Sequence, residues 1–523
     1  MKNLFFLILL MLLPYLSFSQ AVEVEWGEAN KNESFINRIL GETDYEVITL
    51  ASRKENFYIE TYDKKTLKLK NSAPFKLPKE MDKKTEIEKI HFFPETDKIV
   101  LFTSLYLDKT NNIYFYSIDT KANVSKSTLL LSIDVEKKGR KGRFGFDISA
   151  DENTVLVYHT SKLKKEKVKQ VRVKVINSDV ELVADMEDKI PMKDDKRELY
   201  VEDFTFDSNG YIHMLIVKPT KQYRDFFFYT YDSNDEYKRK TYQVELDKDH
   251  IVNTIAFVIN SQNNLVAAGY YSDFAGVFRG LTIQGVFSFE YNPLDNRVLS
   301  KVLSPYNQKD YQNAYGKQAK RFKKGIPSNH YMRELILKSD GSLSLVSEYY
   351  QVTQSSSGVV STVSYIYGDI LVTDLDSKGN INWLQSIPKI QVFTRPSLNL
   401  SFSSSGGFAT LSFSIALMKD KSVFLSYLLS VQEDKIYFVY NDNPKNLEIP
   451  LDDKPKVMKN LNKGIPTLIS MDQTGSIKRE ALPGAKNDEL VLRPRINKEV
   501  DKNTIYVYGN KKKLDKIGRL SFK

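Results

Sequence analysis

Residues 369–389 read DILVTDLDSKGNINWLQSIPK, and this stretch predicts two β-strands joined by a tight turn. The runs DILVTDLD and INWLQSI are rich in β-branched and aromatic residues, which favour extended backbone. Between them, Gly379 can adopt the positive φ that such turns favour. Asp376 ends the first run, where its carboxylate can accept hydrogen bonds from backbone amides of the turn. We therefore interpret Asp376 as a turn residue and not as half of a catalytic carboxylate pair.

The same strand-and-turn pattern recurs along the chain. Other apolar runs that end on Asp or Asn are FYIETYD (57–63), IYFYSID (113–119), FFFYTYD (226–232), VFSFEYN (286–292) and TLISMD (467–472). A second kind of strand follows a polar turn, as in YEVITLA (45–51), KIVLFTS (98–104) and TIYVYGN (504–510), and it occurs eight times. Four antiparallel strands per unit, repeated at roughly fifty residues or more, predict an all-β fold of the β-propeller type.

The last unit predicts a way to complete the ring. It contains three strands, LRPRINK (492–498), TIYVYGN (504–510) and KIGRLSFK (516–523), and the segment AVEVEW (21–26) is a spare strand near the other end. We expect this N-terminal strand to be the fourth strand of the eighth blade, because closure removes exposed sheet edges. The prediction is an eight-bladed propeller with insertions on one face, with seven blades as the alternative.

The first nineteen residues predict a signal peptide. Lys2 gives a positive start, LFFLILLMLL is too short to span a bilayer, and the small-residue segment SFS (17–19) precedes the cleavage site. We expect cleavage near Ser19 and Gln20, a periplasmic or secreted location, and no transmembrane segment in the mature chain. Residues 20–523 then form a single propeller domain.

Composition narrows the classes of protein and partner. The chain has no Cys, which excludes disulfides, thiolate metal sites and the lipid attachment of a lipoprotein. Its formal net charge is +10, and Lys2 is the one charge in the signal, so the mature chain carries +9. For an exported protein we expect this excess to serve solubility, or to attract an anionic surface or acidic glycan, and we expect no nucleic-acid partner.

The long connections fall at one end of the strands. If the strands of a unit are numbered from one to four, the turns between strands one and two are nearly all short. Loops that extend from a rigid scaffold are the usual places for binding. The long segments between strands two and three are 159–170, 272–284, 351–368 and 441–464, and those between units are about 305–329 and 390–422.

Segment 308–324, QKDYQNAYGKQAKRFKK, predicts a short helix with a basic side. Tyr311, Tyr315, Ala319 and Phe322 follow helical spacing on its other side. Two interpretations stay open: a helix that docks on an anionic membrane or acidic partner, and a helix packed on the propeller with a solvated basic side, which we favour. The basic residues are Lys317, Lys320, Arg321, Lys323 and Lys324.

Catalytic and cofactor motifs are missing from the sequence. It contains no G-x-S-x-G, no H-E-x-x-H, no P-loop and no G-x-G-x-x-G, and its five histidines are scattered. We therefore predict no catalytic residue, no metal and no cofactor. His91 and His213 fall within predicted strands, where a hydrogen-bonded core role is expected, and His159, His250 and His330 fall near the elaborated ends of strands.

Residues 326–447 contain three distinctive segments: LILKSDGSLSLVSEYYQV, YGDILVTDLDSKGNINWLQSIPKIQ and LSVQEDKIYFVYNDNPKNL. These segments resemble an uncharacterised family of exported propeller-like proteins of Bacteroidota. The resemblance implies an exported, propeller-like protein and adds no catalytic residue.

Polar residues at the ends of strands in units six and seven form a candidate contact patch, because we expect them on the elaborated face of neighbouring blades. Loop capping is the alternative, since Asn and Asp before Pro444 favour turns. The candidate binding residues are Glu348, Tyr350, Lys389, Gln391, Asn441, Asp442, Asn443 and Lys445, together with Tyr311, Tyr315, Lys320, Arg321 and Phe322 of the predicted helix.

These patterns favour a non-enzymatic binding or scaffold protein of the cell envelope. The expected partner is a protein or an outer-membrane complex, contacted through the elaborated face. The alternative is a carbohydrate-active enzyme, a hydrolase or lyase, with carboxylates at the mouth of the channel. Fold alone does not decide between the two.

Overall fold

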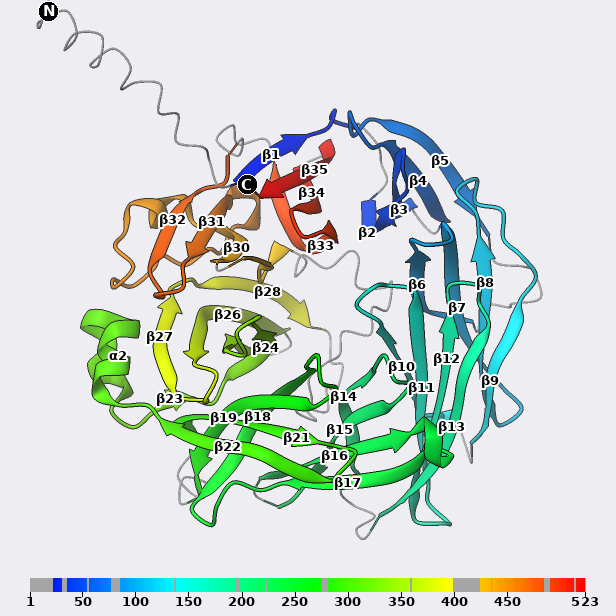
Figure 1. The fold of residues 1–523 in the computed structure, drawn as a ribbon. Helices are drawn as coiled ribbons and strands as arrows, with labels where there is room; N and C mark the ends of the chain where they lie inside the picture. Colours follow the sequence, from blue (N-terminus) through cyan, green and yellow to red (C-terminus); the bar gives the residue numbers. More distant parts are fainter. Residues whose placement is uncertain are drawn as a thin grey trace, which may run out of the picture.

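The computed structural model describes residues 22–30, 35–53, 56–76, 85–135, 138–192, 198–221, 223–274, 281–357, 360–397, 424–433, 435–483, 490–511 and 514–522. The predicted signal peptide and most of the predicted 390–422 insertion lie outside these residues. The described chain consists mainly of four-stranded antiparallel sheets, which follow one another around a common centre (Figure 1). The all-β, propeller-like prediction is therefore confirmed. No helix among the described residues is both long enough and apolar enough to cross a membrane.

We number the sheets 1 to 8 in chain order. The first four sheets consist of consecutive strands. Sheet 1 contains β2 (Phe35–Glu42), β3 (Glu46–Arg53), β4 (Asn56–Asp63) and β5 (Leu69–Phe75). Sheet 2 contains β6 (Glu86–Phe93), β7 (Lys98–Leu107), β8 (Thr110–Ile118) and β9 (Thr128–Asp134). Sheet 3 contains β10 (Arg143–Ile148), β11 (Thr154–Leu163), β12 (Val168–Asn177) and β13 (Leu182–Pro191). Sheet 4 contains β14 (Tyr200–Phe206), β15 (Ile212–Pro219), β16 (Arg224–Asp232) and β17 (Lys238–Val244).

The later sheets carry additions. Sheet 5 contains β18 (His250–Ile259), β19 (Leu265–Asp273), β21 (Gly285–Asn292) and β22 (Arg297–Pro305). Sheet 6 contains β24 (His330–Leu337), β25 (Leu343–Ser357), β26 (Val360–Leu375) and β27 (Ile381–Ile387), with β28 (Gln391–Ser397) also paired to β26. Sheet 7 contains β29 (Leu428–Gln432), β30 (Lys435–Asp442), β31 (Ile465–Met471) and β32 (Ile477–Ala481). Sheet 8 contains β33 (Val491–Asp501), β34 (Thr504–Lys511), β35 (Leu514–Phe522) and β1 (Val22–Trp26).

Short elements connect these sheets. The strands β20 (Thr282–Ile283) and β23 (Ile326–Pro327) pair with each other. The helix α2 contacts the outer strand β27 of sheet 6 and lies outside it in Figure 1. The helices are α2 (Gln308–Tyr315) and the 3-10 turns η2 (Lys138–Arg140), η3 (Ser233–Asp235), η5 (Gly316–Phe322), η8 (Pro444–Glu448) and η9 (Leu461–Lys463).

The N-terminal strand pairs with the last strand of the chain. β1 runs antiparallel to β35, with Val22 opposite Phe522 and Trp26 opposite Gly518. Val22 is 1% exposed and packs in a cluster with residues of sheets 7 and 8. The Trp26 ring lies against Gly518, where a Cβ would clash with it. The N-terminal strand is therefore the fourth strand of sheet 8.

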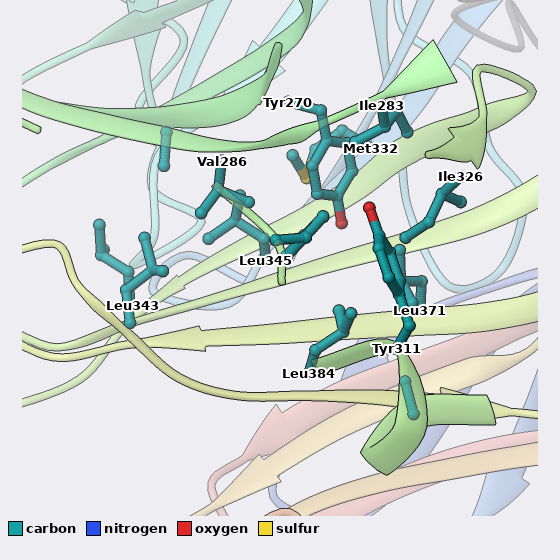
Figure 2. Packing of buried hydrophobic residues seen from close by; sticks show 14 of the residues in the cluster. Tyr270, Ile283, Val286, Tyr311, Ile326, Met332, Leu343, Leu345, Leu371 and Leu384 are labelled. Atoms are coloured by element: carbon teal, nitrogen blue, oxygen red, sulfur yellow. The ribbon is translucent and has the colours of Figure 1, made fainter. Parts of the chain in front are cut away.

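Apolar clusters join each sheet to the next. The first strands of several neighbouring sheets contact one another, which makes the first strand the inner one. The cluster between sheets 5 and 6 is drawn in Figure 2, where Tyr270 and Val286 face Leu345 and Leu371, and Tyr311 of α2 joins them. Seven more clusters join sheets 1 and 2, 2 and 3, 3 and 4, 4 and 5, 6 and 7, 7 and 8, and 8 and 1.

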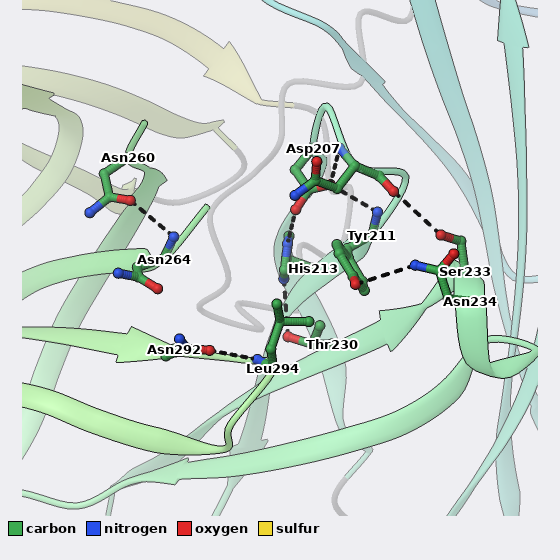
Figure 3. Close-up of polar contacts among 11 residues, drawn as sticks. Asp207, Tyr211, His213, Thr230, Ser233, Asn234, Asn260, Asn264, Asn292 and Leu294 are labelled. Carbon is green, nitrogen blue, oxygen red and sulfur yellow. Dashed lines mark hydrogen bonds and ion pairs between the residues drawn. The ribbon is translucent and has the colours of Figure 1, made fainter. Parts of the chain in front are cut away.

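Carboxylate and amide side chains accept hydrogen bonds from backbone N–H groups in the turns, as the sequence of residues 369–389 predicts. Asp376 Oδ1 accepts hydrogen bonds from the backbone N–H groups of Lys378 (2.9 Å) and Asn380 (2.8 Å), and Gly379 has φ +85°. Figure 3 draws the same arrangement at other turns, where Asp207 accepts from Tyr211, Asn260 from Asn264 and Asn292 from Leu294. The turn interpretation of Asp376 is confirmed.

Deleting β1 should destabilise the protein. A chain that begins at residue 28 loses the burial of Val22 and Trp26 between sheets 7 and 8, so its free energy of unfolding should fall by at least about 2 kcal/mol. Glu28→Ala is the control, because Glu28 forms an exposed ion pair with Lys68 and the loss of this pair should cost less than about 1 kcal/mol. Thermal or denaturant unfolding measures both. Equal stability of the truncated chain and the control would contradict this account.

Candidate functional site

The candidate contact residues of sheets 6 and 7 lie close together, but most of them are buried. Arg333, Glu348, Lys389, Gln391, Ser426 and Asn441 form one hydrogen-bonded set, which we call the buried network. The side chains of Glu348 and Lys389 are both fully buried. Glu348, Lys389, Gln391 and Asn441 therefore lie close together, as strand position predicted. Their direct contact with a partner stays a prediction.

Glu348 is the charged centre of the buried network. Its Oε1 accepts a hydrogen bond from Lys389 Nζ at 2.6 Å, and its Oε2 accepts from Arg333 (3.0 Å) and Ser426 Oγ (2.8 Å). Burial alone would raise the pKa of Glu348, but Lys389 and Arg333 outweigh burial and hold the pKa below its ordinary value. Glu348 is therefore ionised, and both of its oxygens are occupied by neighbours.

The network continues through amides into sheets 7 and 8. Gln391 Oε1 accepts from the backbone N–H of Ser426 (2.8 Å), and Gln391 Nε2 donates to the carbonyl of Asn441 (2.8 Å). The Asn441 side chain donates to the carbonyl of Leu492 (2.7 Å) and accepts from its N–H (3.1 Å). Because Leu492 belongs to β33, the network joins the loop-bearing ends of sheets 6, 7 and 8.

The remaining candidates of sheet 7 stabilise the 443–464 loop. Asn446 Nδ2 donates to Asp442 Oδ1 (2.7 Å), and Asn443 Nδ2 donates to the carbonyl of Val457 (3.1 Å). Asn443 also caps η8 by accepting from the N–H of Lys445. Burial raises the pKa of Asp442. Loop capping, one of the two alternatives from the sequence, therefore describes Asp442 and Asn443, while the Lys445 side chain is exposed.

Aromatic rings surround the buried network. The rings of Tyr350 and Tyr367 have centroids 4.9 Å apart, and Lys389 Nζ lies 6.0 Å from the Tyr367 centroid and 5.9 Å from that of Tyr440. Such ring faces attract a cation electrostatically. Tyr350 is half-buried, so it is a candidate that the structure leaves partly accessible beside the network.

The predicted basic helix is shorter than expected and is packed on the protein. α2 ends at Tyr315, and the chain continues as η5 because Gly316 has φ +49°. Tyr311 and Tyr315 are buried, and Phe322 stacks on Tyr315 with ring centroids 3.9 Å apart. Lys320 and Arg321 are exposed. The packed interpretation is supported, and docking through the exposed basic side stays a prediction.

The inner strands carry a repeated feature that sequence reasoning missed. Each of the inner strands β2, β6, β14, β18 and β24 contains a β-bulge, and the extra residue is polar and has no partner in the strand pairing. The next residue also has a polar or charged side chain. An apolar-polar-polar-apolar run within each inner strand is the signal that could have revealed it. The pairs are Asn37–Arg38, Glu88–Lys89, Glu202–Asp203, Asn253–Thr254 and Arg333–Glu334.

The first residue of the pair bonds the second strand of its sheet. Asn253 hydrogen-bonds Ser272, and Asn37 and Glu88 likewise bond serines of their own sheets. In sheet 6 the corresponding pair is Arg333 and Glu348. Glu348 therefore occupies the position at which three other sheets have a serine, and it forms an ion pair with Arg333. This ion pair is part of the buried network.

The second residue of the pair reaches the centre of the fold. Asp203 and Glu334 are exposed to solvent although they belong to inner strands flanked by neighbouring sheets, so they face the central lumen. The surrounding protein, and then the negative charges of Asp147, Glu202 and Glu334, raise the pKa of Asp203 to about 7. The surrounding protein, which removes part of their hydration, also raises the pKa values of Asp147 and Glu334. Carboxylates of sheets 3, 4 and 6 thus share one wall of the lumen.

Each histidine has a local partner. Figure 3 shows His213 between Asp207 and Thr230, at 3.1 and 3.0 Å. His250 bonds Asp247, while His91, His159 and His330 bond backbone carbonyls. Burial lowers the pKa of these last three to about 4, so they are neutral. Across the described ranges, no three His, Asp or Glu side chains are grouped so as to hold a metal ion.

Comparison with known proteins gives solved structures with low sequence identity and low TM-scores. No protein-family model and no curated protein matches the chain in sequence. The Dos1 propeller is 9% identical, with a TM-score of 0.39 over 94% of this chain and 95% of that one. The β-propeller domain of the Trilobed protease from Pyrococcus furiosus is 8% identical, with a TM-score of 0.34 over 87% and 98%. An uncharacterized protein from Listeria monocytogenes EGD-e is 9% identical, with a TM-score of 0.36 over 82% and 90%. These low values carry no conclusion about function, and the Bacteroidota resemblance stays a prediction.

A double-mutant cycle tests the buried network. Lys389→Met leaves a buried carboxylate without its closest cation, and should cost about 3–5 kcal/mol of unfolding free energy. Glu348→Gln combined with Lys389→Met should recover much of that loss, because no uncompensated charge remains. Lys445→Met, at an exposed position, is the control and should stay within about 0.5 kcal/mol of the wild type. If the two substitutions were simply additive in urea unfolding, the charge pairing would be disproved.

The lumen carboxylate Asp203 makes a prediction about pH. The unfolded side chain loses its proton near pH 3.8 and the folded one near pH 7, so the folded state holds the extra proton between these values and stability falls as pH rises through this window. Asp203→Asn should therefore raise the melting temperature at pH 8 and leave it unchanged near pH 3. Asp44→Asn, on an exposed turn, is the control. A constant difference between wild type and Asp203→Asn at all pH values would contradict the assignment.

Proposed function

We propose that the mature chain, residues 20–523, is a single eight-bladed β-propeller closed by β1, and that it is a non-enzymatic binding or scaffold protein of the cell envelope. Signal-peptide cleavage near Gln20 would deliver it to the periplasm or the exterior. The proposed partner is a protein or an outer-membrane complex. Contact runs through the end of the strands that carries the long loops of sheets 6 and 7.

Two features support eight blades and closure. Sheets 1 to 8 each have four or more strands, and each shares an apolar cluster with the next. A further cluster, with Ile36 and Tyr62 of sheet 1 and Tyr506 and Ile517 of sheet 8, links the last sheet to the first. The pairing of β1 with β35 gives sheet 8 its fourth strand.

The buried network is the observation that carries the proposed function. It ties the loop-bearing ends of sheets 6, 7 and 8 together with charges that have no access to solvent. Glu348 is ionised and saturated, which suits a structural support and not a proton donor or nucleophile. A surface held rigid in this way loses little conformational entropy on binding. Exposed Lys320, Arg321 and Lys445 and the half-buried Tyr350 are available at that end.

A charge-reversal experiment tests the contact face. Lys320→Glu, Arg321→Glu and Lys445→Glu together should weaken association, because exposed charges steer encounter and each pair contributes about 0–1 kcal/mol. The matched control reverses Lys65, Lys121 and Lys378, which lie on exposed turns at the opposite end. Both variants change the net charge equally.

The measurement is affinity capture from the native envelope by each tagged protein, quantified by mass spectrometry. The proposal expects a partner that the wild type and the control retain in equal amounts and that the loop-face variant loses. A partner lost from the control and kept by the loop-face variant would place the contact on the opposite face. A carbohydrate-active enzyme remains the alternative, and turnover of an envelope glycan that Asp203→Asn abolishes would favour it.

A further inference from the structure

The long strands of sheet 6 carry an aromatic face. In their extended part, β26 pairs with β25 on one side and with β28 on the other, so that Tyr367 lies opposite Tyr350 and Tyr365 opposite Phe393. Residues that lie opposite each other, or two apart in one strand, share a face of the sheet. Tyr367 is buried in an apolar cluster with Val491 of sheet 8, whereas the other three rings are half-buried. The aromatic face is therefore turned toward sheet 8.

Two half-buried arginines lie against this aromatic face. Arg495 of β33 donates to Tyr367 Oη at 2.9 Å, and its Cζ lies 5.3 Å from the centroid of the same ring. Arg395 of β28 donates to Tyr365 Oη at 2.8 Å, and its Cζ lies 5.3 Å from that centroid. A guanidinium over an aromatic ring is attracted by the negative face of the ring. The two tyrosine rings therefore hold two cations in fixed positions at the loop-bearing end.

Arg495 has no counter-charge. In the part of the chain that the structure describes it forms no ion pair, and its hydrogen bond to Tyr367 uses one of the five N–H donors of the guanidinium. Two carboxylates belong to the neighbouring buried region. Glu348 already accepts hydrogen bonds from three side chains, and the charge of Asp369 acts on Lys389. The Arg495 guanidinium therefore keeps unused donors and lacks an anionic partner.

Further positive charge surrounds this position. Arg493 belongs to the same bulge of β33, in which residues 493–496 have no partner in β34. Three aromatic rings enclose Arg493 at 5.0 to 5.3 Å, and it too forms no ion pair within the described ranges. Burial raises the pKa of the Tyr350 phenol, while Arg495 and Arg333 act in the opposite direction. The half-buried edge of the aromatic face is therefore cationic.

We infer that Arg495 is the anchor of the partner contact and that it receives a carboxylate of an acidic protein segment. The carboxylate accepts two parallel hydrogen bonds from the guanidinium, whose planar fork matches its two oxygens. Tyr350 and Arg395 lie beside the contact and complete its aromatic and cationic border. This inference rests on the proposed function, because it names the chemistry of the partner bound at the loop-bearing end.

The use of the rings favours an acidic protein segment over a sugar. Stacking on a sugar needs a free ring face, but Tyr365 is stacked by Phe393 and also carries Arg395. The Tyr367 ring is buried and carries Arg495. The accessible groups are therefore guanidinium donors and ring edges. Arginine and tyrosine in partly desolvated surroundings are typical of the energetic centres of protein interfaces.

Calorimetric titration of the mature protein with an end-capped hexaglutamate peptide, at constant ionic strength, tests the inference. Arg495→Met should weaken binding roughly 10- to 100-fold, because the charge-assisted hydrogen bonds are lost. Arg495→Lys should recover only part of this loss, since lysine keeps the charge without the planar fork. Arg297→Met is the matched control: it removes the same charge from an exposed turn at the opposite end and should leave binding unchanged.

A second measurement needs no variant. Modification of the wild-type protein by phenylglyoxal, read by peptide mass spectrometry, should show Arg495 protected by hexaglutamate and Arg297 unprotected. The inference is overturned if hexaglutamate neither binds nor protects Arg495, or if either Arg495 variant binds it as tightly as the wild type. Protection by an oligogalacturonate and not by hexaglutamate would overturn it in favour of an acidic glycan. An envelope partner that Arg495→Met captures as well as the wild type would overturn this inference and leave the proposed function standing.

Discussion

Each four-stranded sheet of this protein has two apolar faces, and both must be buried. Val155 and Val157 of β11 pack toward sheet 2, while Leu156 between them packs toward sheet 4. A sheet of this kind needs a neighbouring sheet on each side. If the eight sheets formed a linear row, the outer faces of the first and the last sheet would be exposed to water. The cluster between sheets 8 and 1 gives both end sheets their second neighbour. This requirement explains why β1 and β35, from opposite ends of the chain, pair with each other.

The buried network solves a different problem at the loop-bearing end. Sheets 6, 7 and 8 diverge there into long connections, and an apolar cluster of Tyr367, Leu425 and Met458 fills part of the space. Lys389 and Glu348 add a charged link that is fully hydrogen-bonded, which makes their burial tolerable. Sheets 1, 2 and 5 use a serine at the position of Glu348. The buried charges of Glu348 and Lys389 therefore occur at the end of the fold that also carries the long loops.

Local patterns in the sequence predicted local structure well. The Asp376 turn, the four-strand repeat and the pairing partner of the N-terminal strand all follow from composition and spacing. Strand position also predicted that Glu348, Lys389 and Asn441 would converge. Their burial was not predictable, because it depends on how Ser426 and Leu492 cover them from other sheets.

The inner-strand bulges were missed for a similar reason. One extra residue in a strand changes which side chains face the lumen, and alternation alone does not reveal it. The predicted helix over 308–324 begins at the right residue but is too long, because Gly316 ends α2 with a positive φ. The grouping of carboxylates at the lumen, such as Asp203 and Glu334, arises only when the inner strands are brought together in space.

Engineered disulfide formation tests the pairing of the two chain ends most directly. The chain has no native Cys, and Glu23 lies opposite Ser521 in the β1–β35 register, with neither side chain buried. Under mild oxidation, Glu23→Cys with Ser521→Cys should form an intramolecular disulfide that raises the melting temperature and is reversed by a reductant. The single-cysteine variants should show neither effect. Two free thiols in the folded, oxidised double variant would contradict the account.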